Sequence, residues 1–501
     1  MNKKRSIKNL IFAMAGQVVT ILAGLVLTRL ILISFGSATN GLLTSVNQIF
    51  TYFTLLEAGV GTASLQALYR PVAEDDKKEI SRILVATKRY YDRTSALYLA
   101  GIVIFAVIYA VLLGGKENGG YIPGSVMVGV IFFSGIGNVV NYKYQGKYKI
   151  LMRAEGRNYI ASNVQTIVQV LVCVAKAIGI ALGGNIVVVM LLGAIVTSAQ
   201  SLYYFWYVRR HYQWLDLSEA PAEIRQTNAV MVHQISQLVF QNTDVLILTI
   251  FCDLRIVSVY SAYKVVVSGL QTVCKNFSES FLFILGQEFA KSKERYCRYV
   301  DLFDIAYSMF SFAIFAVAYV MYLPFIELYT KGVTDINYLN PLYPALFIAI
   351  ELLSGCRCSM QNTINVAGHF QSTLRQTILE TTINLVVSLV SVANFGMIGV
   401  LFGTVAALLY RSNEIIYYGN RKILNRSPWP SYRIYILDLI LFLAAAAASG
   451  FLNLHFSNYF TFLIAAAAAS VIIGVVFLTV NLACFRSECR ELIAMAGKKK
   501  R

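Results

Sequence analysis

The sequence predicts an all-α, polytopic membrane protein with about fourteen transmembrane helices. Of its 501 residues, 57% are hydrophobic and only 14% are charged, and the mean hydropathy is +0.61. Soluble proteins carry about 25% charged residues, so the deficit indicates lipid exposure, because a charge in hydrocarbon costs several kcal/mol. Apolar runs of about twenty residues, the length that spans a bilayer, recur along the whole chain. The segments between them alternate between rich and poor in Lys and Arg, as in multi-pass proteins.

Fourteen apolar runs can be delimited, with ends defined to about two to four residues. The first, 9–35, is too long for the apolar core of a signal peptide and is expected to remain as a transmembrane helix. Pro341 and Pro344 interrupt the start of the tenth run, which a buried membrane helix tolerates. The runs are 9–35, 41–69, 94–114, 123–142, 159–182, 185–207, 228–252, 256–287, 300–322, 339–364, 374–395, 397–419, 433–453 and 459–484.

The basic residues between the runs predict the orientation. Thirty-three Lys and Arg fall in the N-terminus, the C-terminus and alternate loops, whereas the opposite loops hold only Lys116, Arg255 and Lys331. Basic loops stay in the cytoplasm, so both termini are predicted to be cytoplasmic. One helix more or fewer would destroy the alternation, which supports the count of fourteen.

Several other classes of protein fit the sequence poorly. The net charge of +17 follows from the loop bias, so it does not indicate nucleic-acid binding. The eight cysteines lack zinc spacing, and the two in Cys356-Arg357-Cys358 would point about 200° apart on one helix. No phosphate-binding Walker A motif is present, and the outer loops are too short for the domains of membrane sugar polymerases. We therefore expect no cofactor, no metal and no enzymatic activity.

Seven basic residues remain inside the spans, where charges usually face a bundle interior or water. Arg375, Arg411 and Glu414 lie near helix ends and can be interpreted as side chains that reach the headgroups. The seven are Arg29, Lys176, Lys264, Lys275, Arg357, Arg375 and Arg411, and the acidic residues in the spans include Glu57, Asp244, Glu279, Glu351, Glu380, Glu414 and Asp438.

Helical phase places many polar residues on stripes. At about 100° per residue, the polar residues of the fifth run fall within about 60° and those of the eighth within about 80°. Interhelical hydrogen bonding normally needs only one or two polar residues per helix, so stripes of four to six predict a water-filled cavity. The stripes comprise Ser162, Gln165, Gln169 and Lys176; Gln234, Gln237, Gln241 and Asp244; Ser261, Lys264, Ser268, Gln271, Lys275 and Glu279; and Glu351, Ser354, Cys358, Asn362 and Asn365.

The cations give this predicted cavity a partly positive character. A desolvated cationic cavity favours an anionic ligand such as a phosphate. Intramembrane carboxylates either neutralise such cations or bind a coupling proton or sodium ion, and the sequence leaves both roles open. The candidate substrate-binding cations are Arg29, Lys176, Lys264, Lys275 and Arg357; the candidate ion-coupling carboxylates are Glu57, Asp244 and Glu351; the polar cavity residues are Gln165, Gln169, Gln237, Gln241 and Gln271.

The two halves of the chain also repeat weakly, in the parallel sense seen in some transporters. The segment 30–35 resembles 246–251, 154–157 resembles 366–369, and 165–167 resembles 376–378, at offsets between 211 and 216 residues. The shared offset predicts an N-lobe at 1–210 with helices 1–6 and a C-lobe at 211–425 with helices 7–12. The remainder, 426–501, would hold two accessory helices and a basic tail.

Fourteen helices, a six-plus-six repeat and these cytoplasmic turns resemble the polysaccharide transport family. That family belongs to the superfamily that includes multidrug and toxic-compound extruders and the lipid II flippase. The N-terminal residues Asn9, Gln17, Arg29, Phe35-Gly36, Asn40-Gly41 and Glu57-Ala58-Gly59 are similar to its first two helices.

The resemblance implies a flippase in the bacterial cytoplasmic membrane with two lobes that alternate between inward-open and outward-open states. Its substrate would be an undecaprenyl-pyrophosphate-linked glycan, and its other partners membrane lipids, a coupling proton or sodium ion and polysaccharide-assembly proteins. In such flippases luminal cations are thought to hold pyrophosphate or acidic sugars, which Arg29, Lys176, Lys264 and Lys275 could do here. A drug or cation antiporter of the same superfamily is the alternative, although the basic residues in the spans argue against a cationic substrate.

Overall fold

The computed structural model describes residues 3–54, 60–113, 122–222, 228–369, 371–452, 454–486 and 488, and those residues form no β-strand. The chain separates into two units, Met1–Ser258 and Val259–Arg501. The α-helices are α1 (Lys3–Phe53), α2 (Val60–Glu74), α3 (Lys77–Leu113), α4 (Gly124–Ala154), α5 (Asn158–Ala181), α6 (Ile186–His211), α7 (Asn228–Phe251), α8 (Leu254–Lys291), α9 (Lys293–Tyr329), α10 (Leu342–Cys356), α11 (Cys358–Ala367), α12 (Leu374–Tyr418), α13 (Trp429–Ser449) and α14 (Tyr459–Cys484).

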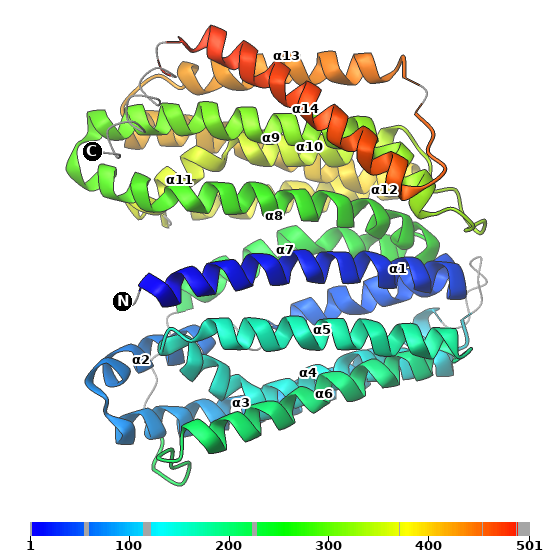
Figure 1. Ribbon diagram of the computed structural model, residues 1–501, viewed down its shortest axis with the longest axis vertical. Helices are drawn as coiled ribbons and strands as arrows, with labels where there is room; N and C mark the ends of the chain where they lie inside the picture. Colours follow the sequence, from blue (N-terminus) through cyan, green and yellow to red (C-terminus); the bar gives the residue numbers. More distant parts are fainter. Residues whose placement is uncertain are drawn as a thin grey trace. The chain divides into compact units, whose positions relative to one another are not determined.

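The first unit is a bundle in which α4 packs between α3 and α6, and α1 packs against α5 and α7 (Figure 1). Its core is built from aliphatic side chains with almost no exposure, such as Leu42, Val46, Ile102 and Val189. Polar contacts also join its helices: the Asn40 amide donates to Ser258 Oγ over 2.8 Å, and Ser45 and Thr249 share a 2.6 Å hydroxyl–hydroxyl hydrogen bond.

Two glycines divide the longest helices into separate passages. Gly36 in α1 has φ 79° and ψ 174°, and Gly396 in α12 has φ 52° and ψ −128°, neither of which is helical. Both lie at boundaries that the sequence predicts, between 9–35 and 41–69 and between 374–395 and 397–419. In the described part of the chain, eleven helices are long and apolar enough to cross a membrane, and Asn242–Phe251 in α7 is a shorter apolar one. Splitting the two kinked helices and counting α7 recovers the fourteen passages.

The second half of α12 folds back against the first as an antiparallel hairpin. Three hydrogen-bonded pairs have the same midpoint, two residues before Gly396: Asn384 with Thr404 (2.9 Å), Ser388 with Val400 (3.2 Å) and Thr377 with Arg411 (3.0 Å). The halves approach so closely that a Cβ atom at Gly403 would lie 2.1 Å from Ser388 Oγ and 2.8 Å from its backbone nitrogen. Only glycine fits there.

We expect Gly403→Ala to destabilise the protein by ~1–3 kcal/mol, because the hairpin must separate to admit a methyl group. Gly474→Ala is the control: it also lies in a membrane helix, but no atom outside its helix backbone lies within 4 Å of the added carbon. The control should be neutral or slightly stabilising, since alanine favours helix. Thermal unfolding in detergent measures both, and equal midpoints for the two variants would contradict the close approach at Gly403.

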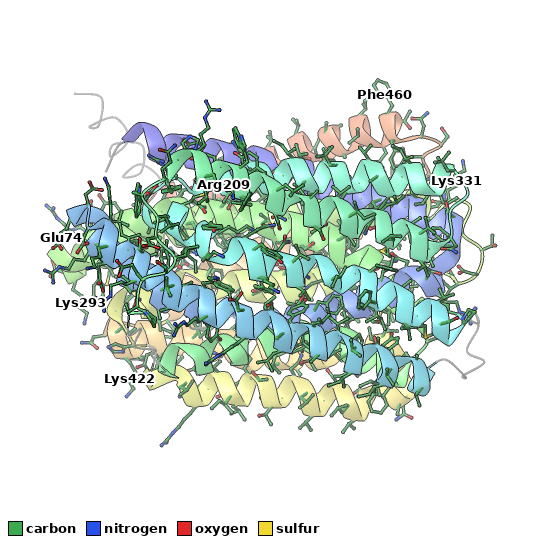
Figure 2. The ribbon with its side chains drawn as sticks, turned by 90° about the horizontal axis from the view of Figure 1, so that it is seen from below. Glu74, Arg209, Lys293, Lys331, Lys422 and Phe460 are labelled. Atoms are coloured by element: carbon green, nitrogen blue, oxygen red, sulfur yellow. The ribbon has the colours of Figure 1, made fainter. Side chains whose placement is uncertain are left out.

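The second unit is organised around α9, which packs against α10, α13 and α14 (Figure 1). Buried tyrosines tie α8 to α9 and to the segment before α10: Tyr263 donates to the Tyr338 carbonyl over 2.8 Å, and Tyr322 donates to the Tyr263 carbonyl over 2.7 Å. Figure 2 places Lys293 and Lys422 at one end of this unit and Lys331 and Phe460 at the other. The loops of this unit therefore alternate between its two ends in the way that the charge pattern predicts.

Several helices extend beyond the predicted apolar runs. α3 begins at Lys77 rather than at 94, and α4 continues to Ala154 rather than ending at 142. Basic residues assigned to loops from the sequence, such as Lys147 and Lys88, therefore lie on helices. Hydropathy detects only the apolar part of a helix, whereas helical backbone continues through charged residues that have good helix propensity.

The tenth passage is not one continuous helix. α10 ends at Cys356 and α11 begins at Cys358, so Arg357 caps both helices. The unit boundary at Ser258 places α7 with α1 to α6, whereas the repeat predicts a boundary at 210. The division into lobes and accessory helices remains a prediction.

Candidate functional site

Four charged side chains form a buried network in the second unit. Arg357 donates to Glu380 Oε1 over 2.6 Å, Arg411 Nε lies 3.4 Å from Glu380 Oε2, and Arg411 also pairs with Glu414. The side chains of Arg411 and Glu380 are only 4% and 7% exposed. Arg411 Nη2 donates a hydrogen bond to Thr377 Oγ1 over 3.0 Å. Two cations and two anions cancel, so the network as a whole carries no net charge.

The α12 hairpin creates this network. It places Thr377 and Glu380 of its first half beside Arg411 of its second half, one turn from Glu414. Interpreting Arg411 and Glu414 as side chains that reach the headgroups was therefore wrong, because both are turned inward and paired. The hairpin register, with its turn at Gly396, is the sequence signal that brings residues 377 and 411 together.

Lys264 and Glu351 lie on facing helices of the same unit, α8 and α10. Glu351 is 4% exposed, and the charges of Lys264 and Arg357 both act on its carboxyl group. Lys264 is half-buried. Two of the predicted substrate-binding cations and one predicted ion-coupling carboxylate therefore lie near one another, although Arg357 is itself held by Glu380.

About four turns further along α8 and two turns further along α10–α11, Ser278 of α8 contacts the polar stripe of α10–α11. Ser278 Oγ lies 3.1 Å from Cys358 Sγ, and the Asn362 amide donates to Ser278 Oγ over 3.0 Å. By contrast, Lys275 is 72% exposed and pairs loosely with Glu279 at 3.8 Å, and Gln271 is also exposed. Lys264 and Lys275 therefore occupy different environments on one helix, since the first is half-buried and the second is exposed.

In the first unit, Lys176 of α5 points toward α6. Its side chain fills the space beside Gly193, where a Cβ atom would lie 2.4 Å from Lys176 Cε and 3.4 Å from its Nζ. Gln165 lies on the same stripe, about three turns closer to the start of α5. The Gln200 amide of α6 donates to Gln165 Oε1 over 3.4 Å. Gln169 and Arg29 are half-buried on α5 and α1.

Asp244 of α7 is buried, with 6% exposure, and its charge acts on Tyr52 of α1. Glu57 lies outside the described residues, and the same holds for the side chains of Gln237 and Gln241. The roles assigned to all these candidates from the sequence remain predictions.

The second unit also contains an apolar cavity of about 580 Å³. It lies among α9, α10, the second half of α12 and α13, and Ala349, Leu409, Phe442 and Ala446 are part of its wall. Its few polar groups are already engaged: Tyr432 donates to Asn413 Oδ1 over 2.8 Å, and Ser412 donates to the Leu353 carbonyl over 2.7 Å. The lining can accept hydrocarbon but offers little to a charged or strongly polar molecule.

Sequence reasoning missed this cavity and the role of Glu380. The cavity needs the packing of four helices that are distant in sequence, and no periodic pattern reports it. The second unit therefore combines a buried charge network, a half-buried lysine and an apolar cavity, and such a combination can bind an amphiphile. The described residues of the network and the cavity do not pair a nucleophile with a base.

No protein-family model and no curated protein matches the sequence. Solved structures do match. The lipid II flippase MurJ, in an inward-closed conformation, aligns with 95% of this chain and 99% of its own at 11% identity and a TM-score of 0.67. A multidrug-resistance MATE transporter of the MOP superfamily aligns in its inward-facing form with 86% of this chain and 99% of its own, at 13% identity and a TM-score of 0.62. An outward-facing MATE structure aligns with 84% of this chain and 96% of its own, at 15% identity and a TM-score of 0.53. All three similar proteins are transporters, and this multi-pass membrane protein has the fold of the MOP-superfamily transporters.

Proposed function

We propose that the protein flips a polyprenyl-pyrophosphate-linked oligosaccharide, a precursor of a cell-surface polysaccharide, from the inner to the outer leaflet. It would do so by alternating access in the bacterial cytoplasmic membrane, driven by a proton or sodium gradient, with both termini in the cytoplasm. The apolar cavity beside α13 is the observation that carries this proposal, because an amphiphilic cargo needs a place for its hydrocarbon tail. Each buried CH₂ group contributes ~0.8 kcal/mol to the binding of such a tail.

The charged residues support an anionic headgroup at the other end of the cargo. Within the described residues, Lys264 of the second unit is half-buried and forms no ion pair, and the side chain of Lys176 in the first unit lies beside Gly193. A phosphate oxygen near such a lysine gains a charge-assisted hydrogen bond. Glu351 and Asp244 are buried carboxylates that could release or bind a coupling ion as the cargo arrives.

We expect Lys264→Ala to reduce flipping at least about tenfold, which corresponds to ~1.4 kcal/mol, while Lys264→Arg retains a substantial part. The assay uses proteoliposomes that contain a defined polyprenyl-pyrophosphate glycan, and it follows the appearance of the glycan in the outer leaflet. Lys331→Ala, at an exposed lysine just after the end of α9, is the control and should be silent. Unchanged flipping in Lys264→Ala, Lys275→Ala and the double variant would exclude a cationic headgroup site on α8.

Export of a small cationic drug is a second candidate, and the likeness to MATE structures together with the buried Asp244 favours it. The same protein expressed in an efflux-deficient host distinguishes the two. Drug resistance that disappears in Asp244→Asn would support the exporter, whereas flipping without resistance supports the lipid-linked cargo.

A further inference from the structure

Two helices of the second unit hold each other through reciprocal carboxyl contacts. On α9, Asp304 accepts hydrogen bonds from two residues of α13, Ser431 (2.9 Å) and Tyr435 (2.7 Å). In return, Asp438 of α13 accepts a 2.5 Å hydrogen bond from Ser308 of α9. The residues of each helix are spaced by three or four positions, so each set occupies a single helical face.

α14 completes the cluster through Asn481, whose amide donates to Asp438 Oδ1 over 2.8 Å. The carboxyl-bearing residues are almost fully buried, Asp304 at 1% and Asp438 at 0% exposure. Within the described residues, no Lys, Arg or His pairs with either carboxyl group; the neighbouring Arg426 is held by Asp301 at 2.8 Å, and Arg433 by Glu488 at 3.2 Å.

One buried acceptor of the cluster has no hydrogen-bond donor. Asn481 Oδ1 is buried, at 1% residue exposure, and accepts no hydrogen bond from the described residues. Ser359 Oγ of α11, which also approaches Asp304, is likewise buried without a geometric partner. A buried acceptor without a donor costs ~1–3 kcal/mol. A proton on a carboxyl group adds one donor to a cluster that has an unsatisfied acceptor.

Two unpaired negative charges are even more costly than a missing donor. An ionised carboxylate in a membrane interior needs a cation or several hydrogen bonds to offset desolvation. Asp304 and Asp438 each receive two hydrogen bonds and no cation, whereas Glu380 in the same unit contacts two guanidinium groups. We propose that Asp304 and Asp438 form a proton-binding site in which the carboxyl groups hold at least one proton at neutral pH.

The site differs from the carboxylates predicted to couple ions, Glu57, Asp244 and Glu351, and it does not depend on the identity of the cargo. Its chemistry is simple: a carboxylate takes one proton from the aqueous phase and becomes a carboxylic acid, with no other bond made or broken. Asp301, one turn before Asp304 on α9, pairs with Arg426 at 2.8 Å and its side chain is 29% exposed, so the cluster lies one helical turn from a partly exposed carboxylate.

The proton links pH to the docking of α13 and α14 on α9. Loss of the proton leaves like charges on facing helices, with nothing to neutralise them. The ionisable groups that face the cluster are themselves neutral or negative, apart from the cation already paired with Asp301; they are Asp301 and Tyr296 on α9, Cys356 on α10, Cys358 on α11 and Tyr435 on α13.

The direction of the pH effect follows from proton linkage. An unfolded chain releases these protons at acidic pH, so at neutral pH the folded state binds more protons than the unfolded state does. Stability then decreases as pH rises. We expect the unfolding midpoint of the wild-type protein to fall between about pH 6 and about pH 9 and the fall to be smaller in Asp304→Asn/Asp438→Asn.

Infrared spectroscopy of the protein in lipid tests the proton directly. The C=O stretch of a protonated carboxyl group is separate from those of carboxylates and amides and shifts in D₂O. We expect a D₂O-sensitive band at neutral pH that loses intensity in Asp304→Asn or in Asp438→Asn. Glu327→Gln is the matched control and should keep the whole band, because the Glu327 side chain of α9 is 44% exposed and lies outside the cluster, 2.9 Å from His455.

A second variant covers the case in which an Asp→Asn protein does not fold. Ser308→Ala keeps both carboxyl groups but removes one donor to Asp438, so it should shift the frequency of the band rather than abolish it. A wild-type protein without a protonated-carboxyl band at neutral pH would overturn the proposal. A band that is identical in both Asp→Asn variants and in Ser308→Ala would do the same, and the cluster would then be an ionised structural contact.

Discussion

Glu380→Gln is expected to destabilise the protein by ~3–5 kcal/mol, the cost of removing one partner from a buried ion pair. Glu380 is the only group in the described charge network that contacts both guanidinium groups, and its side chain is 7% exposed. Neutralising it leaves Arg411, at 4% side-chain exposure, with Glu414 alone. Arg357 loses its 2.6 Å contact at the point where α10 ends and α11 begins. Unfolding in detergent, followed by tryptophan fluorescence or circular dichroism, measures the change.

An exposed contact between a glutamate and a histidine in the same unit provides the comparison. Glu327 lies 2.9 Å from His455, with side chains that are 44% and 75% exposed. Glu327→Gln should cost less than ~1 kcal/mol, because exposed pairs are screened by solvent. If Glu380→Gln were as mild as Glu327→Gln, the network would not be holding α10, α11 and α12 together.

The consequence of the network reaches beyond stability. Arg357 was predicted to contact an anionic substrate. In the structure its guanidinium group instead pairs with the carboxylate of Glu380. An anionic headgroup could reach Arg357 only in exchange for Glu380, and the cost of that exchange favours Lys264 as the first contact. This is the reason for choosing Lys264 rather than Arg357 in the flipping assay.

The sequence predicts the passages of this fold well, because a bilayer imposes a length and an apolar composition on each of them. It also places the breaks near Gly36 and Gly396, where the backbone is non-helical. Hydropathy did not predict the helical extensions of α3 and α4, because a helix outside the membrane does not need an apolar run of residues. The sequence did not predict the break at Arg357, although Gly355 lies two residues before it, because the Arg357 side chain is held by a tertiary contact with Glu380.

The candidate site was harder to predict than the passages. Helical phase places Cys358 and Asn362 on one polar stripe, and both contact Ser278 of α8, a residue outside the predicted stripe of that helix. Phase does not say which helix faces which, so the pairing of Arg411 with Glu380 and the reciprocal contacts of Asp304 and Asp438 could not be derived. Both depend on the rotation and register of packed helices, which side-chain packing determines.

Filling the apolar cavity should have the largest effect on transport. Ala446→Trp places an indole into the 580 Å³ space from α13, and Ala349→Trp does so from α10. If a polyprenyl tail occupies this space during flipping, either variant should reduce flipping at least about tenfold, since the loss of two buried CH₂ groups already amounts to ~1.6 kcal/mol. The glycan flipping assay in proteoliposomes measures this loss.

The neighbouring residue on α13 supplies the matched control. Ala447 is exposed and does not line the cavity, so Ala447→Trp adds the same indole to the same helix without occupying the space. Reduced flipping in Ala446→Trp but not in Ala447→Trp assigns the effect to the cavity rather than to α13 itself. A short-chain analogue of the cargo should be less sensitive than the full-length lipid, because it has less tail to bury. Equal loss for both chain lengths would mean that the indole acts by blocking helix movement, and the cavity would then not be a site for the tail.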